Sequence, residues 1–382
     1  MSVARIFPVI MAGGASSRLW PASGLSKPKW DLRLFGSGAD KSQSLLENVW
    51  ARGRSVAPAA QCFVVTGVAQ AELVRKSLPE LPPENLLVEP EPRDTSGAVA
   101  YATGAILNFL NKHNAGREDD ENIMLVLPGD QIISPLSEFA ACALTGAKVA
   151  IEHDALVTFG ILPRKPATGY GYIHRAGALE VGSTEDIGRG TKLPLAYRVQ
   201  GFKEKPDLAT AEAYIKSGEY YWNGGIFLWR VSAVQAEFQR QLPGHAALAT
   251  ALGRTTNKEE WDALARESFP NLKKISIDYG IMENARTVAT VVAEFEWDDI
   301  GSWSAVADHL DKSSGNAIGP QTNVLSLDSK SNLVFTPGKR VALIGVEGLA
   351  IVESENEILI CKLDRDQDVK KISEMAKKSK LE

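Results

Sequence analysis

The stretch VIMAGGASSRLWPASGLSKPKW, residues 9–30, begins as an apolar strand and then breaks at Gly13-Gly14 into a loop of small polar residues. Arg18, Lys27 and Lys29 follow closely. Glycines let backbone N–H groups approach a phosphate, and basic side chains neutralise its charge. The spacing fits neither G-x-x-x-x-G-K-[ST] nor G-x-G-x-x-G, which excludes the P-loop and dinucleotide motifs. A phosphate site and a plain surface turn both remain open for this loop.

The composition is that of an ordinary globular protein. The chain has 382 residues, of which 44% are hydrophobic and 23% charged. This length suggests two or three domains. The formal net charge of −5 argues against a protein that coats nucleic acid or anionic lipid, because both need a broad basic surface. A small anionic ligand remains open, since basic residues can gather locally.

Cysteine usage and hydropathy indicate a compartment. Cys62, Cys142 and Cys361 lie far apart, so we expect neither a disulfide framework nor a thiolate metal site, which is typical of a reducing compartment. We find no charged-then-apolar leader and no apolar run of about 18 residues. We therefore expect a cytoplasmic protein that binds neither a membrane nor nucleic acid.

Strands and helices alternate in the first part of the chain. Apolar runs such as ARIFPVIM, CFVVTG and NIMLVLPGD are separated by segments with helical spacing, which predicts a parallel sheet covered on both faces. Ligands bind beyond the carboxyl ends of such strands, and the first strand–helix turn is the favoured place. The opening loop is that turn. From about Tyr170, aromatic-rich strands predict an extension of the same sheet.

The last part of the chain has a different texture. KSSGNAIGP, residues 312–320, is typical of a linker. Beyond it come short strands separated by turns at Ser331-Asn332, Pro337-Gly338, Glu347-Gly348 and Glu355-Asn356. We expect a small all-β domain, closed by a lysine-rich helix from about Gln367.

Two acidic motifs follow apolar runs. NIMLVLPGD places Asp130 at the carboxyl end of a buried strand, and EWDDIGSW places Asp298 and Asp299 after another apolar run. Mg²⁺ prefers one or two carboxylates together with phosphate oxygens. A metal–phosphate site is therefore a plausible hypothesis, whereas Gly-Asp in isolation favours a simple turn.

Two further motifs suggest a polar ligand. In GFKEKP, strand alternation predicts that Glu204 points away from Lys203 and Lys205. At a strand end these side chains suit sugar hydroxyls and a phosphate, and a solvated sheet edge is the alternative. In YYWNGGIFLW, Asn223 precedes a glycine pair, which favours either a hydroxyl-binding residue or an Asn-Gly turn.

Together and in order, these motifs resemble the mannose-1-phosphate guanylyltransferases, within the wider sugar-1-phosphate nucleotidyltransferases. EPEPRDTSGA is similar to the family's E-P-x-x-R-N-T segment beside the nucleotide base, and SIDYGIMENA and WDDIGSW complete the set. The resemblance covers roughly residues 3–370. The family's G-G-x-G-x-R-L-W-P-x-S-R-x-x-x-P-K-Q-F signature is matched at Gly13, Gly14, Arg18, Leu19, Trp20, Pro21, Ser23, Pro28 and Lys29.

Five departures from the family pattern stand out. Ser16 replaces the third glycine, which requires a backbone turn that avoids positive φ or accepts a side chain. The others are Gly24 for an arginine, Trp30-Asp31 for Gln-Phe, Asp94 for an asparagine and Gln131 for a histidine.

The resemblance implies an α/β fold with a Rossmann-like, mostly parallel sheet, the nucleotide-diphospho-sugar transferase fold, and a small C-terminal β-helix-like domain. The expected domains are a nucleotidyltransferase catalytic domain, residues 1–311, and a small β domain with a terminal helix, residues 312–382. The family's β tail often packs on the catalytic domain or between subunits, so a homodimer is compatible with it.

The resemblance also implies an enzyme and its reaction. GTP and mannose 1-phosphate give GDP-mannose and pyrophosphate, with Mg²⁺ assisting in-line attack of the sugar phosphate on the α-phosphorus. Two alternatives remain: the same reaction on another sugar 1-phosphate or nucleotide, and a non-catalytic regulatory protein that binds a sugar nucleotide.

Residue roles are implied by the same resemblance. Arg18 and Lys29 are the expected catalytic residues, and Asp130 and Asp299 the expected Mg²⁺ ligands. Nucleotide binding is expected at Ala12, Gly13, Gly14, Ser17, Arg18, Glu89, Arg93, Thr95 and Ser96. Sugar binding is expected at Gly171, Glu204, Lys205 and Asn223.

Overall fold

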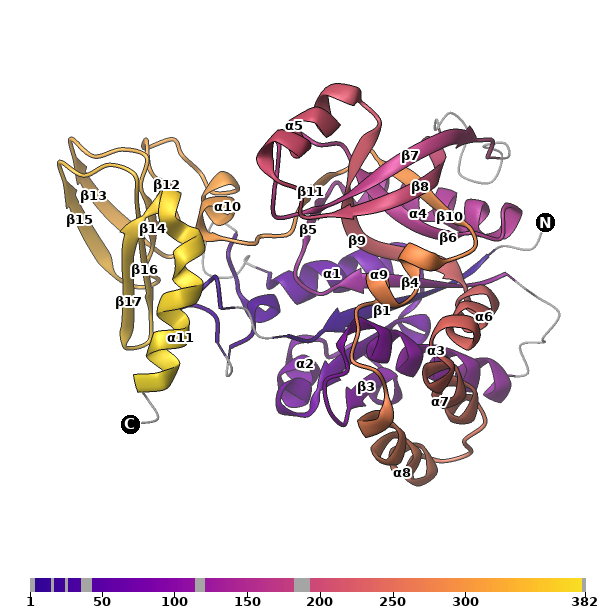
Figure 1. The fold of residues 1–382 in the computed structure, drawn as a ribbon. Coiled ribbons are helices and arrows are strands. Elements are labelled where there is room, and N and C mark those ends of the chain that lie inside the picture. The colour runs from indigo at the N-terminus through magenta and orange to yellow at the C-terminus, as the bar shows by residue number, and fades with distance from the viewer. Residues whose placement is uncertain are drawn as a thin grey trace. The chain divides into compact units, whose positions relative to one another are not determined.

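The chain divides into two compact units in the computed structural model (Figure 1). The structure describes residues 4–14, 17–24, 27–35, 43–113, 121–181 and 193–379. The first unit comprises Met1–Ala12, Trp50–Pro128 and Ile133–Trp297, and the second comprises Gly13–Val49, Gly129–Ile132 and Asp298–Glu382. The opening motif therefore contributes its strand to the first unit and its loop to the second.

A nine-stranded sheet within the described ranges organises the first unit, in the order β3-β2-β1-β4-β9-β6-β10-β8-β7. Neighbouring strands from β3 to β4 pair in parallel, and β8 and β9 run against the other strands. This confirms the mostly parallel α/β sheet. The strands are β1 (Arg5–Ala12), β2 (Phe63–Gly67), β3 (Leu86–Glu89), β4 (Asn122–Pro128), β6 (Leu156–Ile161), β7 (Gly171–Leu179), β8 (Ala196–Glu204), β9 (Tyr220–Arg230) and β10 (Val288–Ala293).

The aromatic-rich strands do extend this sheet, as expected, and they do so by antiparallel pairing. β7 and β8 form its end, whereas β9 lies in the middle and pairs antiparallel with both β4 and β6. A central strand must bury both faces, and β9 is apolar along most of its length with Ile226–Trp229 all buried.

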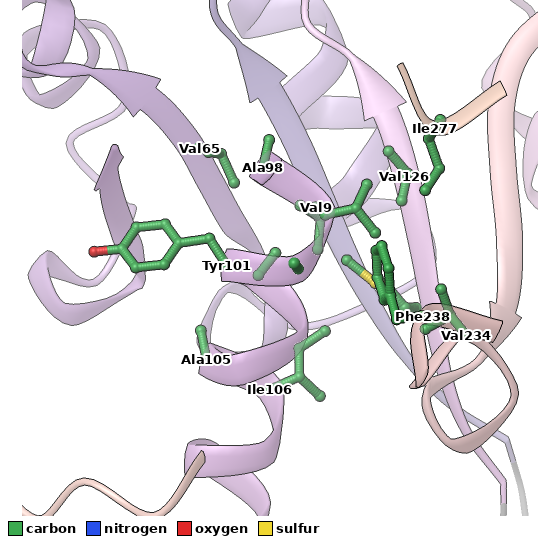
Figure 2. Packing of buried hydrophobic residues seen from close by; sticks show 14 of the residues in the cluster. Val9, Val65, Ala98, Tyr101, Ala105, Ile106, Val126, Val234, Phe238 and Ile277 are labelled. Atoms are coloured by element: carbon green, nitrogen blue, oxygen red, sulfur yellow. The ribbon is translucent and has the colours of Figure 1, made fainter. Parts of the chain in front are cut away.

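Helices cover both faces of the sheet. α3 packs on β1, β2 and β3 and against α7, and Figure 2 shows Ala98, Tyr101 and Ala105 of α3 among strand residues such as Val9. α4 packs on β6, β9 and β10, on the opposite face. The helices are α2 (Ala71–Ser77), α3 (Asp94–Lys112), α4 (Leu136–Glu152), α5 (Leu208–Ser217), α6 (Val231–Gln241), α7 (Pro243–Gly253), α8 (Lys258–Ser268) and α9 (Ile277–Gly280).

Short elements complete the first unit, and three elements carry residues of both units. The 3₁₀ turns are η2 (Ala59–Gln61), η3 (Val68–Gln70), η4 (Pro83–Asn85), η6 (Phe269–Asn271) and η7 (Met282–Asn284). The shared elements are α1 (Leu45–Arg54), β5 (Ile132–Ser134) and β11 (Glu296–Asp298).

The second unit contains the β-helix-like region. β12, β14 and β16 pair in parallel, β13 pairs in parallel with β15, and β17 returns antiparallel to β16. Residues 312–320 are not only a linker, because they include β12, which pairs with β14. The elements are η1 (Lys29–Asp31), α10 (Trp303–Asp308), β12 (Ala317–Ile318), β13 (Asn323–Leu327), β14 (Leu333–Phe335), β15 (Arg340–Ile344), β16 (Leu349–Ser354), β17 (Glu357–Lys362), η8 (Leu363–Asp368) and α11 (Val369–Ser379).

Two buried asparagines tie the turns of this region together. Asn332 donates through Nδ2 to Asn316 Oδ1 at 2.9 Å and to the Val346 carbonyl at 3.0 Å. Its Oδ1 accepts from the Leu349 amide at 2.9 Å. The turn residues Ser331, Gly338 and Gly348 all have positive φ, which agrees with the turns expected from the sequence. Successive turns therefore stack on side-chain amides, as in asparagine ladders.

Two other sequence features have a clear structural outcome. The three cysteines are free, and Cys62 and Cys142 are buried. Within the described ranges, no helix combines the length and the apolar character needed to cross a membrane.

Candidate active site

The space beside the backbone of the glycine pair that follows β1 is open. Gly14 has φ +90°, a conformation that side-chain-bearing residues rarely adopt, and a Cβ on either Gly13 or Gly14 would meet no atom within 4 Å. In the first unit, Ala12 at the end of β1 accepts a hydrogen bond from Thr66 Oγ1 at 2.7 Å. Ser16, which replaces a family glycine, lies outside the described residues.

The loop after the glycines is anchored by its apolar residues. Leu19 is fully buried in the core of the second unit, and Ser23 N donates to its carbonyl at 3.0 Å. Trp303 of α10 donates through Nε1 to the Trp20 carbonyl at 3.1 Å. Arg18 is exposed beside this anchor, so its guanidinium projects from a fixed turn; Ser17 is half-buried.

Lys29 joins two distant aspartates. Lys29 is the first residue of η1, and it is only 8% exposed. Its Nζ donates to Asp130 Oδ2 at 2.6 Å and to the Asp299 main-chain carbonyl at 2.5 Å. A buried ammonium needs such partners, because an unpaired charge away from water is costly. The structure thus brings together Lys29, Asp130 and Asp299, all in the second unit.

Asp130 stands where the sequence predicts it. β4 ends at Pro128, and Gly129-Asp130 turns directly after it. The Asp130 side chain remains 39% exposed despite its ion pair with Lys29, so part of the carboxylate is open to a ligand. Gln131, at the position of a family histidine, is buried beside it.

The loop that presents Asp299 is held in a strained conformation. Asp298 Oδ1 accepts from the Ile300 amide at 2.7 Å, and Ile300 has φ +46° although it is β-branched and fully buried. Such a conformation persists only where the surroundings impose it, and it is common at functional sites. The Asp299 carboxylate turns back over Gly301, where a Cβ would lie 3.1 Å from Oδ2.

Asp130 and Asp299 suit a divalent cation whose coordination is completed by phosphate oxygens of the substrate. Within the described residues, no group of three or more His, Cys, Asp or Glu side chains could hold a metal ion alone. Mg²⁺ usually takes one or two carboxylates and fills its remaining positions with water and phosphate oxygens. The Asp130 carboxylate and the Asp299 main-chain carbonyl both accept hydrogen bonds from one ammonium group, so two oxygens already surround a positive charge here.

The predicted sugar-binding residues converge in the first unit. Gly171 opposes Glu204 in the β7–β8 ladder, and a Cβ on Gly171 would lie 2.6 Å from Glu204 Oε2 and 3.6 Å from Asn223 Cβ. Asn223 lies within β9 rather than in an Asn-Gly turn, beside an irregularity in the β6–β9 register. Gly224 comes close to its neighbour as expected, since a Cβ would lie 3.0 Å from the Phe159 carbonyl.

The expected alternation of Glu204 and Lys205 is wrong. β8 ends at Glu204, and Lys205 has φ +45°, which breaks the strand geometry. The Lys205 ammonium therefore turns back and donates to Glu204 Oε1 at 2.5 Å. Lys205 is 60% exposed, so the pair lies at the surface.

Sequence reasoning left two acidic residues of SIDYGIMENA without a role. Asn223 Nδ2 donates to Asp278 Oδ1 at 2.9 Å. Burial raises the pKa of Asp278, and the Glu204 charge adds to the shift. Burial and Glu204 likewise raise the pKa of Glu283. Three carboxylates thus gather here, and the motif in the sequence was the available signal for the two that were missed.

The segment that is predicted to bind the nucleotide base lies at the junction of β3 and α3. Glu89 ends β3, and Arg93 precedes α3, which begins with Asp94. Asp94 has φ +60°, a conformation that aspartate and asparagine tolerate better than most residues, which accounts for this exchange with the family asparagine. Ser96 is fully buried.

A short segment around α9 links the base segment to the sugar cluster. Ile277 N donates to Thr95 Oγ1 at 2.7 Å, and the next residue, Asp278, accepts from Asn223. Ser96 N also donates to the Ile275 carbonyl at 3.2 Å. The two predicted binding regions of the first unit are therefore adjacent.

Lys27 has different surroundings from Lys29. It lines a cavity of about 590 Å³ in the second unit, together with Arg33, Lys339, Asp31, Glu353 and Glu355 among others. None of the predicted site residues lines this cavity. Its cationic and acidic groups balance, three of each, whereas Lys29 contacts Asp130 and Asp299.

The chain belongs to the nucleotidyl transferase family, whose model matches residues 7–314. A second model, for the mannoseP isomerase/GMP-like β-helix domain, matches residues 322–375. The chain is thus an enzyme of the nucleotidyltransferase class. In the sequence, its β-helix-like domain follows the nucleotidyl transferase region.

Curated relatives carry more specific names. Xanthan biosynthesis protein XanB of Xanthomonas campestris pv. campestris is 36% identical over 96% of this chain and 72% of XanB. A Klebsiella pneumoniae protein named mannose-1-phosphate guanylyltransferase is 35% identical over 98% of this chain and 74% of its own length. These matches confirm the resemblance to the mannose-1-phosphate guanylyltransferases.

A solved structure supports the same assignment. A Thermus thermophilus protein described as a mannose-1-phosphate geranyltransferase superposes with a TM-score of 0.80 at 29% identity. The superposition covers 98% of this chain and 99% of that one. The expected nucleotidyltransferase fold is therefore confirmed along nearly the whole chain.

Proposed function

We propose that this chain transfers GMP from GTP to mannose 1-phosphate and releases pyrophosphate, giving GDP-mannose. The observation that carries the proposal is the contact of one buried ammonium, Lys29, with both Asp130 and Asp299 in a chain of the nucleotidyl transferase family. Relatives from several bacteria named mannose-1-phosphate guanylyltransferase support the choice of substrates.

The proposed chemistry is an in-line displacement. An oxygen of the sugar phosphate attacks the α-phosphorus of GTP, a new P–O bond forms, and the bond to the pyrophosphate oxygen breaks. Two anions that repel each other must be held in line, so positioning and charge stabilisation supply most of the catalysis. No side-chain nucleophile is needed.

Arg18 and Lys29 have distinct proposed roles. The exposed Arg18 and the N–H groups after Gly13 hold the triphosphate of the nucleotide. Lys29 supplies positive charge at the transferring phosphate, where charge develops in the transition state. Its buried ammonium is already oriented by two oxygens and needs little reorganisation.

Asp130 and Asp299 are the proposed ligands of Mg²⁺. When bound, the ion neutralises charge on the phosphates that react. The two residues offer what such an ion needs from a protein: a partly exposed Asp130 carboxylate and an Asp299 carboxylate held by a rigid loop.

The clusters of the first unit are the proposed binding sites for the sugar and the base. Glu204 accepts hydrogen bonds from sugar hydroxyls, Lys205 binds the sugar phosphate once it releases Glu204, and Asn223 and Gly171 shape the pocket. The nucleotide is held by Ala12, Gly13, Gly14, Ser17, Glu89, Arg93, Thr95 and Ser96.

The organisation of the whole protein is also proposed. Residues 1–311 form the catalytic domain and residues 312–382 the small β domain, which the bounds of the two family models support. The proposed assembly is a homodimer, and the proposed location is the cytoplasm, in keeping with three free cysteines.

A substrate panel tests the proposal. Pyrophosphate release is measured for GTP, ATP, UTP and dTTP, each with mannose, glucose and galactose 1-phosphate, with Mg²⁺ and with excess EDTA. We expect the highest kcat/KM for GTP with mannose 1-phosphate, and loss of turnover in EDTA. A preference for another pair would reassign the substrate, and tight GDP-mannose binding without turnover would indicate a regulatory protein.

A further inference from the structure

The central strand β9 bulges where it passes β6, and Asn223 stands at the start of the bulge. In the β6–β9 register, Thr158 pairs with Phe227 and Gly160 pairs with Asn223. Residues 224–226 of β9 therefore lie opposite a single residue of β6. A bulge of this kind bends a strand and redirects its side chains. The bulge, rather than regular strand alternation, thus sets the direction of the Asn223 side chain.

Two donors close the bulge on the oxygen of the Asn223 amide. Gly225, with φ +65°, donates through its backbone N–H group to Asn223 Oδ1 at 3.2 Å. Thr158 is fully buried, and its Oγ1 lies 3.1 Å from Asn223 Oδ1 and 3.2 Å from the Ile226 carbonyl, two acceptors that share its one hydrogen. An amide oxygen has two lone pairs, so Oδ1 is fully used within the fold.

The nitrogen of the same amide faces Asp278. Asn223 Nδ2 donates to Asp278 Oδ1 at 2.9 Å. Asp278 is itself held in place, because the amide of the preceding Ile277 donates to Thr95 Oγ1 at 2.7 Å. A backbone N–H group can only donate, so oxygen must face Gly225 and nitrogen must face Asp278. The orientation of the amide is therefore fixed.

One hydrogen of Asn223 Nδ2 is left for a ligand. The amide nitrogen carries two hydrogens, and within the described residues only the bond to Asp278 uses one of them. Asn223 is half-buried, and a Cβ on Gly171 would lie 3.6 Å from Asn223 Cβ and 2.6 Å from Glu204 Oε2. The missing side chain at Gly171 thus leaves space beside Asn223, which can offer a ligand there a donor but no free acceptor.

We propose that Thr158 and Asp278 are positioning residues for the sugar, which hold the Asn223 amide so that it meets the sugar with an N–H donor. This inference rests on the proposed function, in which Asn223 binds the sugar, and adds the two residues that set the polarity of that contact. Both act through Asn223 and not on the sugar itself. When either is lost, the amide can rotate, and the sugar no longer meets a fixed donor.

Steady-state kinetics of Thr158→Val test this role, because the substitution removes only the hydroxyl group that contacts Asn223. We expect KM for mannose 1-phosphate to rise roughly tenfold, the effect of one hydrogen bond, while KM for GTP and kcat stay near wild type. Thr158→Ser keeps the hydroxyl and should keep the wild-type KM. In an Asn223→Ala background, Thr158→Val should add no further change, because it acts only through Asn223.

Thr290→Val is the matched control. Thr290 pairs with Thr158 in the β10–β6 ladder and is also fully buried, and its Oγ1 has no hydrogen-bond partner among the described residues. Loss of this hydroxyl should leave KM for mannose 1-phosphate unchanged.

A swap of the amide and the carboxylate separates positioning from structural support. Asn223→Asp combined with Asp278→Asn rebuilds a hydrogen bond between positions 223 and 278 with its direction reversed. We expect the swap to recover most of the Tm that Asn223→Asp alone loses. KM for mannose 1-phosphate should nevertheless stay at least about tenfold above wild type, because the sugar then meets an acceptor. A wild-type KM in the swapped protein would overturn the proposal.

Calorimetric binding of sugar 1-phosphates distinguishes failure of this inference from failure of the proposed function. It is measured with a GTP analogue that carries a methylene group between the α- and β-phosphorus atoms and so cannot react. If another sugar binds best, the proposed function is wrong, and the inference stands when Thr158→Val weakens that binding only in the presence of Asn223. Unchanged affinity in folded Thr158→Val, or an equal loss in the Asn223→Ala background, would overturn the inference even with full GMP transfer. The swap decides the question if Thr158→Val does not fold, and a folded wild-type protein that binds none of these sugars would overturn both.

Discussion

Two lysines of the opening motif, two residues apart, illustrate how burial assigns a role. Lys29 is buried and contacts Asp130 and Asp299, whereas Lys27 is exposed and lines a cavity with balanced charges. Both are lysines in the same polar stretch of sequence. Only the side chain with two fixed oxygen partners is prepared to stabilise charge on a phosphate.

We predict that Lys29→Ala lowers kcat by on the order of 10²-fold or more, because it removes preorganised charge stabilisation worth several kcal/mol. Lys27→Ala is the matched control and should keep near wild-type turnover. Steady-state kinetics of pyrophosphate release, with circular dichroism to verify folding, decide the matter. Near wild-type turnover in folded Lys29→Ala would show that this lysine is not catalytic.

Ionisation of the Glu89 side chain destabilises the folded protein when no ligand is bound. Burial, together with the nearby Asp94 charge, raises the pKa of Glu89 to about 7. The Arg93 side chain lies alongside. The folded state therefore binds a proton more tightly than the unfolded chain does, so stability falls as pH rises from the ordinary glutamate pKa to about 7.

We predict that Glu89→Gln raises the Tm of the unliganded protein at pH 8, because the neutral amide avoids ionisation of a buried group. The gain in the free energy of unfolding should be about 1–3 kcal/mol at pH 8 and should vanish near pH 4.5. Thermal melts across this range measure it, with Glu84→Gln, a change at an exposed carboxylate in η4, as the control. If Glu89→Gln were no more stable than the wild-type protein at pH 8, ionised Glu89 would not destabilise the fold.

At the scale of elements, the loop between β11 and α10 shows how a rigid turn presents a functional group. Asp298 caps the Ile300 amide, Ile300 is locked in the core with positive φ, and Ser302 caps α10 by accepting from Ala305 N. Asp299 lies between these fixed points. Its carboxylate is oriented by the element rather than by its own rotamer alone.

We predict that Gly301→Ala impairs activity without unfolding the protein. The new Cβ would lie 3.1 Å from Asp299 Oδ2, closer than ordinary contact, so the carboxylate must shift by a few tenths of an ångström. We expect kcat to fall roughly tenfold, since small displacements of catalytic groups are costly, with little change in Tm. Gly67→Ala, where a Cβ meets no atom within 4 Å, is the control. Full activity in Gly301→Ala would exclude a precise role for this carboxylate.

Element order explains what the sequence could and could not predict. The hydrophobic patterns predicted β1, the strand before Asp130 and the β-helix-like turns, because local periodicity and turn residues determine them. They could not place β9 between β4 and β6, which depends on pairing between distant segments. The positive φ that returns Lys205 to Glu204 also has no local signal, since lysine rarely adopts it.

The same limit applies to the candidate site. Strand-end position singled out Asp130 and the pair Asp298 and Asp299, and the family resemblance selected Asp299 from that pair. The contact of Lys29 with both Asp130 and Asp299 appears only in three dimensions. The adjacency of Thr95 and Asn223 depends on Ile277 and Asp278, more than 50 residues beyond Asn223 in sequence. Motifs thus identify candidate residues, and the fold determines which of them meet.

For the whole molecule, the two units rest on different means of stabilisation. Helices packed on a sheet bury a continuous apolar core in the first unit (Figure 2), whereas the β-helix-like region of the second unit also depends on stacked turns. The stability of the second unit should therefore respond to loss of one buried amide.

We predict that Asn332→Ala lowers the free energy of unfolding by about 2–4 kcal/mol, because it removes the acceptor of the Leu349 N–H group and the Nδ2–H donations to Asn316 and to the Val346 carbonyl. Asn323→Ala, at an exposed position at the start of β13, should change stability by less than about 0.5 kcal/mol. Chemical denaturation of both variants gives the comparison. Equal stability of the two would show that the ladder is not structural.

The most direct measurement of the central claim follows the phosphates of GTP through the reaction with mannose 1-phosphate. Two samples are compared, one labelled with ³²P at the α-position and one at the γ-position. The account predicts that the α-label appears in the sugar nucleotide and the γ-label in pyrophosphate, both at a rate that Lys29→Ala greatly reduces. The γ-label in the sugar product, or no transfer of the α-label by the folded wild-type protein, would contradict it.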